Sequence, residues 1–138
     1  MTSANDRDRQ RLKLLRDNLA ALHKTLIESE RIIYEQTFGK LESPNRFLQL
    51  LISDPWFAWL HPISELVVLI DETLDSKEPL MAGETRELMK RTSMLLKASE
   101  EGDGFERSYF DALQRTPDVI LAHADVMRCL SEPKPKSE

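Results

Sequence analysis

A heptad pattern of aliphatic side chains in the first third of the chain most narrows the folds available to it. The side chains recur at alternating steps of three and four residues, with Ser29 in one slot; they are Leu12, Leu15, Leu19, Leu22, Leu26 and Ile33. Such steps place residues on one face of a helix, as at the a and d positions of a bundle helix or short coiled coil. The pattern predicts a long first helix over residues 7–38, with Gly39 at the usual position of a left-handed C-cap.

Three later helix starts share one local signal, a side-chain oxygen at the N-cap followed by proline at the first helical position. They are Ser43-Pro44, Asp54-Pro55 and Thr116-Pro117. We therefore expect helices over residues 44–53 and 55–74 as two collinear or kinked pieces. Pro62 should add a distortion, because its ring would clash with the carbonyl of Ala58 in a continuous helix.

The second half of the chain predicts two more helical segments. One should span residues 80–101 and stop at the glycines that follow, and the other should span residues 105–130 with a break at Thr116-Pro117. Merging the broken pieces gives four long segments with short connections, which favours an all-α, up-down-up-down four-helix bundle. We expect one domain over residues 1–130 and a disordered, proline-containing tail over residues 131–138.

Composition excludes several classes of function and location. The formal net charge of −5 argues against a nucleic-acid binder, which needs a basic surface. The basic residues within positions 7–16 alternate with aspartates, so we interpret that segment as a solvated helix start. Cys129 has no second cysteine to pair with, the first residues lack an apolar signal segment, and the aliphatic run Leu66–Ile70 is too short to span a bilayer. We therefore expect a soluble, cytoplasmic protein with no membrane partner.

The histidines and acidic residues suggest a metal site of the haemerythrin type. His61 and Glu65 are spaced i, i+4, and together with His23 and His123 they would be its ligands. Helical phase opposes this hypothesis, because His61 and Glu65 point away from the apolar stripe of their own helix. We therefore expect no bound metal or cofactor. His123 lies within an apolar stripe and is predicted to be a core residue bonded to a carbonyl or a hydroxyl group.

The aromatic residues Trp56, Phe57 and Trp59 admit two interpretations. They either fill the core at the end of the bundle, or they form a binding patch, because tryptophan dominates such patches. The candidate ligand or partner patch consists of Trp56, Phe57, Trp59, His61 and His123.

Signals for catalysis are weak. The chain has no Gly-x-Ser-x-Gly turn and no glycine-rich phosphate loop, and Cys129 lies late in a helix, where the negative end of the dipole raises a thiol pKa. These observations favour a protein that is not an enzyme.

The segment Asp54-Pro55-Trp56-Phe57-Ala58-Trp59-Leu60, followed by Pro62, resembles a segment of small uncharacterised bacterial all-helical proteins. They carry a similar Asp-Pro-x-Phe-Ala-Trp-Leu-x-Pro pattern. The resemblance covers residues 44–72 and implies an all-helical bacterial protein, with no known activity and no site residues to transfer.

Together these features predict a non-enzymatic interaction or regulatory protein that forms a homodimer. Its interface would be the leucine face of the first helix or the exposed end of the aromatic segment. One alternative is a small-molecule-binding bundle with a pocket near Trp56, Trp59 and His123. A second alternative is the haemerythrin-like metal-binding bundle.

Overall fold

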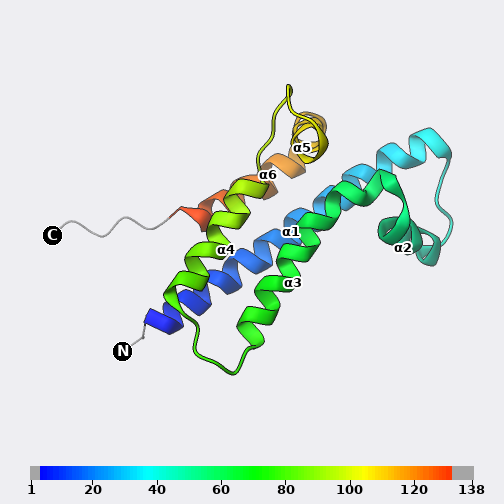
Figure 1. Cartoon of the computed structure of the whole chain (residues 1–138). Helices are drawn as coiled ribbons and strands as arrows, with labels where there is room; N and C mark the ends of the chain where they lie inside the picture. Colours follow the sequence, from blue (N-terminus) through cyan, green and yellow to red (C-terminus); the bar gives the residue numbers. More distant parts are fainter. Residues whose placement is uncertain (1–3, 132–138) are drawn as a thin grey trace.

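The computed structural model describes residues 4–131, and within this range all regular structure is helical, with no strand (Figure 1). This confirms the all-α class. Six α-helices and one 3-10 helix, η1, are found in the described range: α1 (Ala4–Phe38), α2 (Pro44–Ser53), η1 (Pro55–Leu60), α3 (His61–Asp75), α4 (Ala82–Leu95), α5 (Gly104–Arg115) and α6 (Pro117–Leu130).

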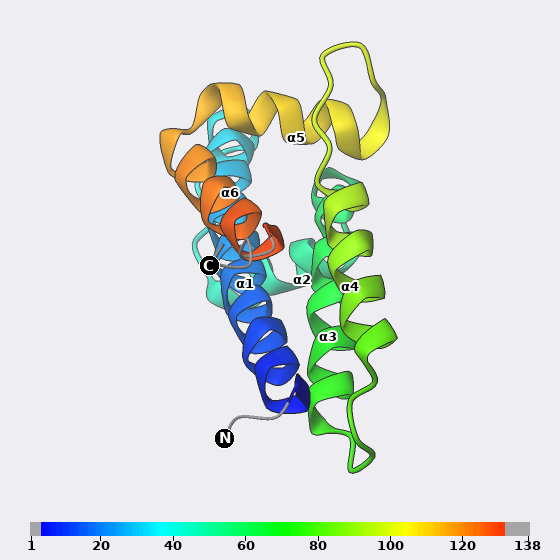
Figure 2. The ribbon, with the colours of Figure 1, turned by 90° about the vertical axis from the view of Figure 1, so that its left-hand side faces the viewer.

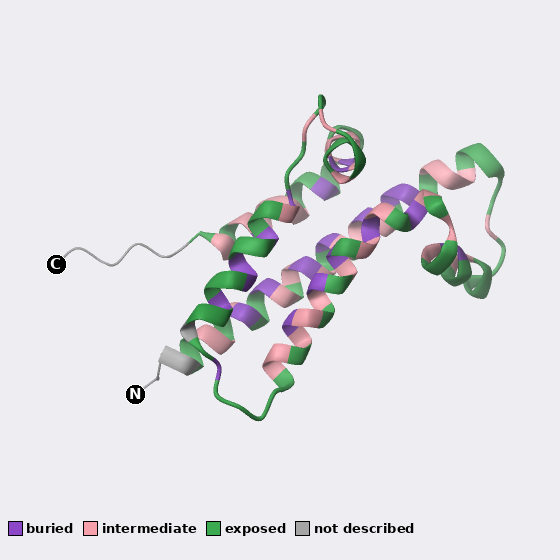
Figure 3. Cartoon of the chain, in the orientation of Figure 1, coloured by how far each residue is buried: buried purple, intermediate pink, exposed green. Residues whose placement is uncertain are grey.

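The long helix α1 lies at the centre of the molecule and packs against η1, α3, α4, α5 and α6. Its heptad leucines are 0% exposed and Ser29 is also buried, so the predicted apolar face is confirmed (Figure 3); the leucines are Leu12, Leu15, Leu19, Leu22 and Leu26. Gly39 ends the helix with a φ of 99°, and its N–H donates to the carbonyl of Glu35. Glycine adopts this left-handed conformation without a side-chain clash.

Four helices run roughly alongside one another with alternating direction. In Figure 2, α1 and α4 ascend while α3 and α6 descend, and α5 lies across their upper end. The pairs α1–α3, α3–α4, α4–α6 and α1–α6 are all in contact. The leucine face of α1 is thereby covered on several sides.

Two of the three predicted N-caps form as expected. The Ser43 hydroxyl accepts from the N–H of Arg46 at 3.0 Å, and a carboxylate oxygen of Asp54 accepts from the N–H of Trp56 at 2.8 Å. Thr116 precedes α6 as predicted, but its hydroxyl bonds the Ser29 hydroxyl at 2.7 Å and caps nothing.

Residues 55–74 do not form the single kinked helix that we predicted. Pro55–Leu60 is a 3-10 helix, and α3 begins at His61, so Pro62 lies in its first turn. A proline there removes no helical hydrogen bond, and the predicted clash with Ala58 does not arise. Likewise α2 is not collinear with α3 but lies to one side of it, beyond η1 (Figure 1).

The third predicted segment is shorter than expected, because α4 ends at Leu95. The loop that follows is held against α5 by two bonds. The N–H of Ser99 donates to the carbonyl of Glu106 at 3.0 Å, and the Arg107 guanidinium donates to the carbonyl of Glu100 at 2.9 Å. The predicted break at Thr116 separates two helices that point in different directions. The predicted tail lies outside the described residues except for Ser131.

Candidate functional site

Trp56 belongs to an aromatic group at the C-terminal end of α1, which we call the aromatic end: Tyr34, Phe38 and Trp56. The Trp56 ring meets the Tyr34 and Phe38 rings edge-on, with both centroid distances at 5.6 Å. Phe38 remains 64% exposed despite these contacts. The aromatic end is therefore an ordered apolar surface open to solvent.

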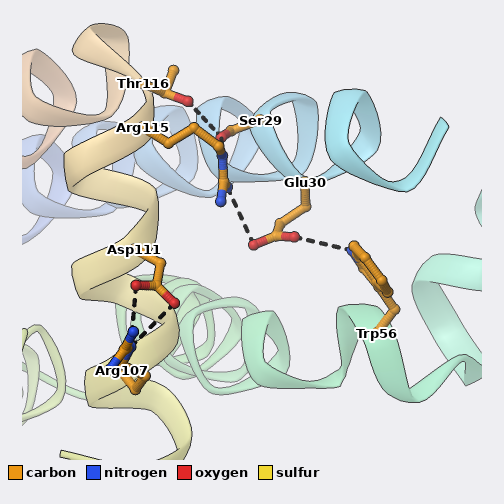
Figure 4. Close-up of polar contacts among 7 residues, drawn as sticks. All are labelled: Ser29, Glu30, Trp56, Arg107, Asp111, Arg115 and Thr116. Carbon is orange, nitrogen blue, oxygen red and sulfur yellow. Dashed lines mark hydrogen bonds and ion pairs between the residues drawn. The ribbon is translucent and has the colours of Figure 1, made fainter. Parts of the chain in front are cut away.

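A polar network beneath the aromatic end fixes the indole of Trp56 (Figure 4). Its Nε1–H donates to Glu30 Oε2 at 3.0 Å, and Glu30 is only 7% exposed. The other carboxylate oxygen of Glu30 lies 3.4 Å from the Arg115 guanidinium, which also donates to the Ser29 hydroxyl at 2.9 Å. This network joins α1 to η1 and to the turn between α5 and α6.

Sequence reasoning did not identify Glu30 or Arg115. The one available signal was Ser29, a polar residue in an otherwise aliphatic heptad position, since a buried hydroxyl at such a position requires a polar partner.

Phe57, the residue after Trp56, is fully buried. Its ring lies 5.4 Å from that of Tyr34 and 5.8 Å from that of Phe47, and the Arg31 guanidinium stacks over Phe47 at 5.2 Å. This position suits the core-filling role.

Trp59 begins a second row of aromatic contacts that runs away from the aromatic end. Its ring lies 5.4 Å from that of Phe105, which in turn lies 5.4 Å from that of Tyr109. The Tyr109 hydroxyl bonds His123 Nδ1 at 2.6 Å. We call Trp59, Phe105, Tyr109 and His123 the buried row, after Tyr109, which is fully buried; the other three residues are half-buried. Trp56, Trp59 and His123, which the pocket hypothesis groups together, thus lie in two separate clusters.

The chemistry of the Tyr109–His123 pair is set by burial. Burial raises the pKa of Tyr109, so the phenol keeps its proton and donates it to Nδ1. Neutral His123 therefore carries its proton on Nε2, and burial lowers the pKa of His123 so that this neutral form is favoured. His123 bonds a hydroxyl group, as its apolar stripe predicted, but it is half-buried and is not a core residue.

His23 and His61 line one cavity of about 360 Å³ at the junction of α1, α2, η1 and α3. We call it the histidine cavity. His61 Nε2 bonds the carbonyl of Leu51 at 2.8 Å. Burial lowers the pKa of His23, and the neighbouring His61 lowers it further. Sequence reasoning named both histidines but had no means of placing α2 beside them.

The four hypothetical metal ligands are not brought together. His23 and His61 share the histidine cavity, His123 bonds Tyr109, and Glu65 lines a different cavity between α3 and α4 beside Arg91. Within residues 4–131 there is no group of three or more histidine, cysteine, aspartate or glutamate side chains arranged to hold a metal ion.

Cys129 is half-buried, and its sulfur accepts from the Asn18 side-chain amide at 3.3 Å. Burial raises its pKa, while the Asn18 bond and Arg128 oppose this effect. The sequence also predicted a raised pKa for Cys129, but the leading cause is burial and not the helix dipole.

The basic start of α1 is not simply solvated, as we had interpreted it. The Arg16 guanidinium donates to both carboxylate oxygens of Asp71 on α3, at 2.8 and 3.3 Å, and Arg9 donates to the carbonyl of Leu74 at 2.8 Å. These bonds connect the beginning of α1 to the end of α3.

Comparison of the chain with protein-family models, with curated proteins and with solved structures finds no match. None of the helices in the described part of the chain combines the length and the apolar character needed to cross a membrane.

Proposed function

We propose that this protein is a non-enzymatic interaction protein that forms a homodimer through its aromatic end. The observation that carries the proposal is the state of Phe38, which is held in place by two aromatic neighbours yet is 64% exposed. Ordered aromatic side chains supply large apolar contact area at low conformational cost, and aromatic residues are enriched at interfaces.

The rigidity of the aromatic end supports this role. Glu30 and the network beneath it hold the Trp56 indole, so the surface is preorganised before any partner arrives. Binding by a preorganised surface costs less side-chain ordering than binding by a mobile one.

The uncharged character of the aromatic end permits a second copy of the chain as the partner. The chain carries a formal net charge of −5, so two copies repel each other except where uncharged surfaces meet. Tyr34, Phe38 and Trp56 carry no carboxylate, ammonium or guanidinium group, and the same patch on both copies can form a two-fold interface. We propose the aromatic end and not the leucine face of α1, the other predicted interface, because the leucines of that face are buried within one chain.

As part of the same proposal, α1, α3, α4 and α6 constitute an up-down-up-down four-helix bundle, with α2 and α5 as crossing pieces at one end. The closed ring of contacts α1–α3–α4–α6 supports this assignment. We also place the function in the cytoplasm, since the single cysteine, Cys129, requires no oxidising compartment.

Sedimentation of the full chain and of two charge variants tests the dimer. Phe38→Glu places a carboxylate in the interface and should yield a monomer. Leu121→Glu on α6 is the matched control, because Leu121 is 65% exposed and lies outside the aromatic end; it should leave the dimer intact. A monomeric wild-type protein, or equal dimers in both variants, would overturn the proposal.

A further inference from the structure

The histidine cavity combines an apolar wall with two imidazoles. The apolar side chains come from α1, α2 and η1 and are Ile27, Leu48, Leu51, Ile52, Phe57 and Leu60. The polar side chains are His23, His61 and Ser64, and no lysine, arginine, aspartate or glutamate is found among the described residues that line it.

The apolar wall suits a small hydrophobic body. Phe57 and Leu60 are buried, whereas Leu48 and Ile52 are largely exposed on α2, where a ligand would cover them. The volume of about 360 Å³ falls within the range of small-molecule sites, which are mostly apolar with a few polar groups.

The hydrogen bonding of the two imidazoles defines the polar side. A carbonyl oxygen can only accept, so His61 Nε2 donates its proton to Leu51, and this bond fixes the His61 ring. His23 is half-buried and makes no hydrogen bond to any residue in the described range. It is therefore a donor that protein groups leave unused.

We propose that the histidine cavity binds an amphiphile with one carboxylate and an apolar body, such as a medium-chain aliphatic acid. The carboxylate accepts a hydrogen bond from His23, and the body lies against Ile27, Leu48 and Ile52. No acidic side chain in the lining repels this anion, whereas a cationic head group would meet two imidazoles and no counter-charge.

The proposal links binding to proton uptake at His23. Its lining neighbours are Leu48, Leu51 and Ile52 from α2, Phe57 and Leu60 from η1, and His61 and Ser64 from α3. Of these side chains, His61 is the one with an ionisable group. Because burial and His61 disfavour protonated His23, a bound carboxylate restores the charged form, and binding should be tighter at low pH.

Calorimetry on the full chain tests the ligand class with three probes that share one chain length: octanoate, octan-1-ol and octylamine. Near the ordinary histidine pKa of about 6.5, octanoate should bind about tenfold more tightly than octan-1-ol, because a charge-assisted hydrogen bond is the stronger kind. Octylamine should bind most weakly. Equal affinity for octanoate and octan-1-ol, or no binding by octanoate, would overturn the proposal.

Variants test the site. His23→Leu should remove both the preference for octanoate and the proton uptake measured in buffers of different ionisation enthalpy. Because His23 is partly buried, two variants of the exposed Ile52 give a second test. Ile52→Lys and Ile52→Glu lose the same apolar side chain and differ in the charge that they add. The lysine variant should bind octanoate more tightly than the glutamate variant. Leu121→Glu, remote from the cavity, should bind as the wild type does. Unchanged octanoate binding in His23→Leu, or equal binding in the two Ile52 variants, contradicts the assignment.

Discussion

The aromatic end and the buried row begin only three residues apart, at Trp56 and Trp59, yet they end in opposite environments. The first leads outward to exposed Phe38, and the second leads inward through Phe105 to fully buried Tyr109. A 3-10 helix has three residues per turn, so Trp56 and Trp59 should lie on the same side of η1. Their different environments therefore depend on what each ring packs against. Trp56 meets α1 and Trp59 meets α5. Aromatic content by itself therefore does not distinguish a binding surface from a core.

Removal of the tyrosine side chain from the buried row should have the largest effect. Tyr109→Ala deletes a ring that is 0% exposed, and large-to-small changes of this type cost about 3–5 kcal/mol. Urea unfolding followed by circular dichroism measures the loss. Tyr109→Phe keeps the ring and loses only the bond to His123, so it should cost about 1 kcal/mol. If Tyr109→Ala costs no more than Tyr109→Phe, the row is not part of the core.

The network beneath the aromatic end should come next. Glu30→Ala leaves the Trp56 indole without its acceptor and removes the ion-pair partner of Arg115, which keeps only its bond to Ser29; the change should cost about 1–3 kcal/mol in urea unfolding. Glu28→Ala is the matched control two residues away, where the carboxylate is exposed and pairs loosely with Arg31 at 3.6 Å. It should change the stability by less than about 0.5 kcal/mol. Equal costs for the two variants would mean that the network contributes no stability.

Changes at the exposed end should separate stability from association. Phe38→Ser removes an exposed ring and should cost less than about 1 kcal/mol, because few of its contacts are lost from the core. The same variant should sediment as a monomer. A large loss of stability with an intact dimer would mean that Phe38 is a core residue and that the aromatic end is not the interface.

Acid should weaken the fold through the two histidines whose pKa values are lowered by burial, His23 and His123. A lowered folded pKa means that the unfolded chain binds more protons, so this contribution is complete above the unfolded pKa and is lost as the pH falls through the folded pKa. The urea midpoint should therefore decrease between about pH 7 and about pH 5. The double variant His23→Leu, His123→Gln should show a shallower decrease, and an unchanged slope would assign the effect to other groups.

Local signals predicted much of the helical structure. The heptad leucines identified the buried face of α1, and Ser43 and Asp54 marked the starts of α2 and η1, because a cap and a helix face depend on residues close in sequence. The same signals could not reveal that Pro62 follows a 3-10 turn, since that choice depends on how the Trp59 and Phe57 rings pack.

The site residues were harder to predict, because they depend on how distant helices meet. From the sequence alone, Glu30 would be predicted to be a solvated charge. In the structure it pairs with Arg115, at the end of α5. His23 lies on α1 and His61 at the start of α3, and the packing of these two helices makes them neighbours. The helical-phase argument covered single helices and could not address either arrangement.

The pairing of α1 with α6 has a consequence for synthesis. Asn18 and Cys129 touch although 111 residues separate them, so α1 can meet one of its main partners only after α6 has been synthesised. Until then the leucine face of α1 is incompletely covered, and exposed apolar surface of this kind promotes aggregation and attracts chaperones. A nascent chain that stalls before residue 117 would keep the part of that face that α6 covers exposed, so synthesis through α6 is needed to bury the leucine face of α1.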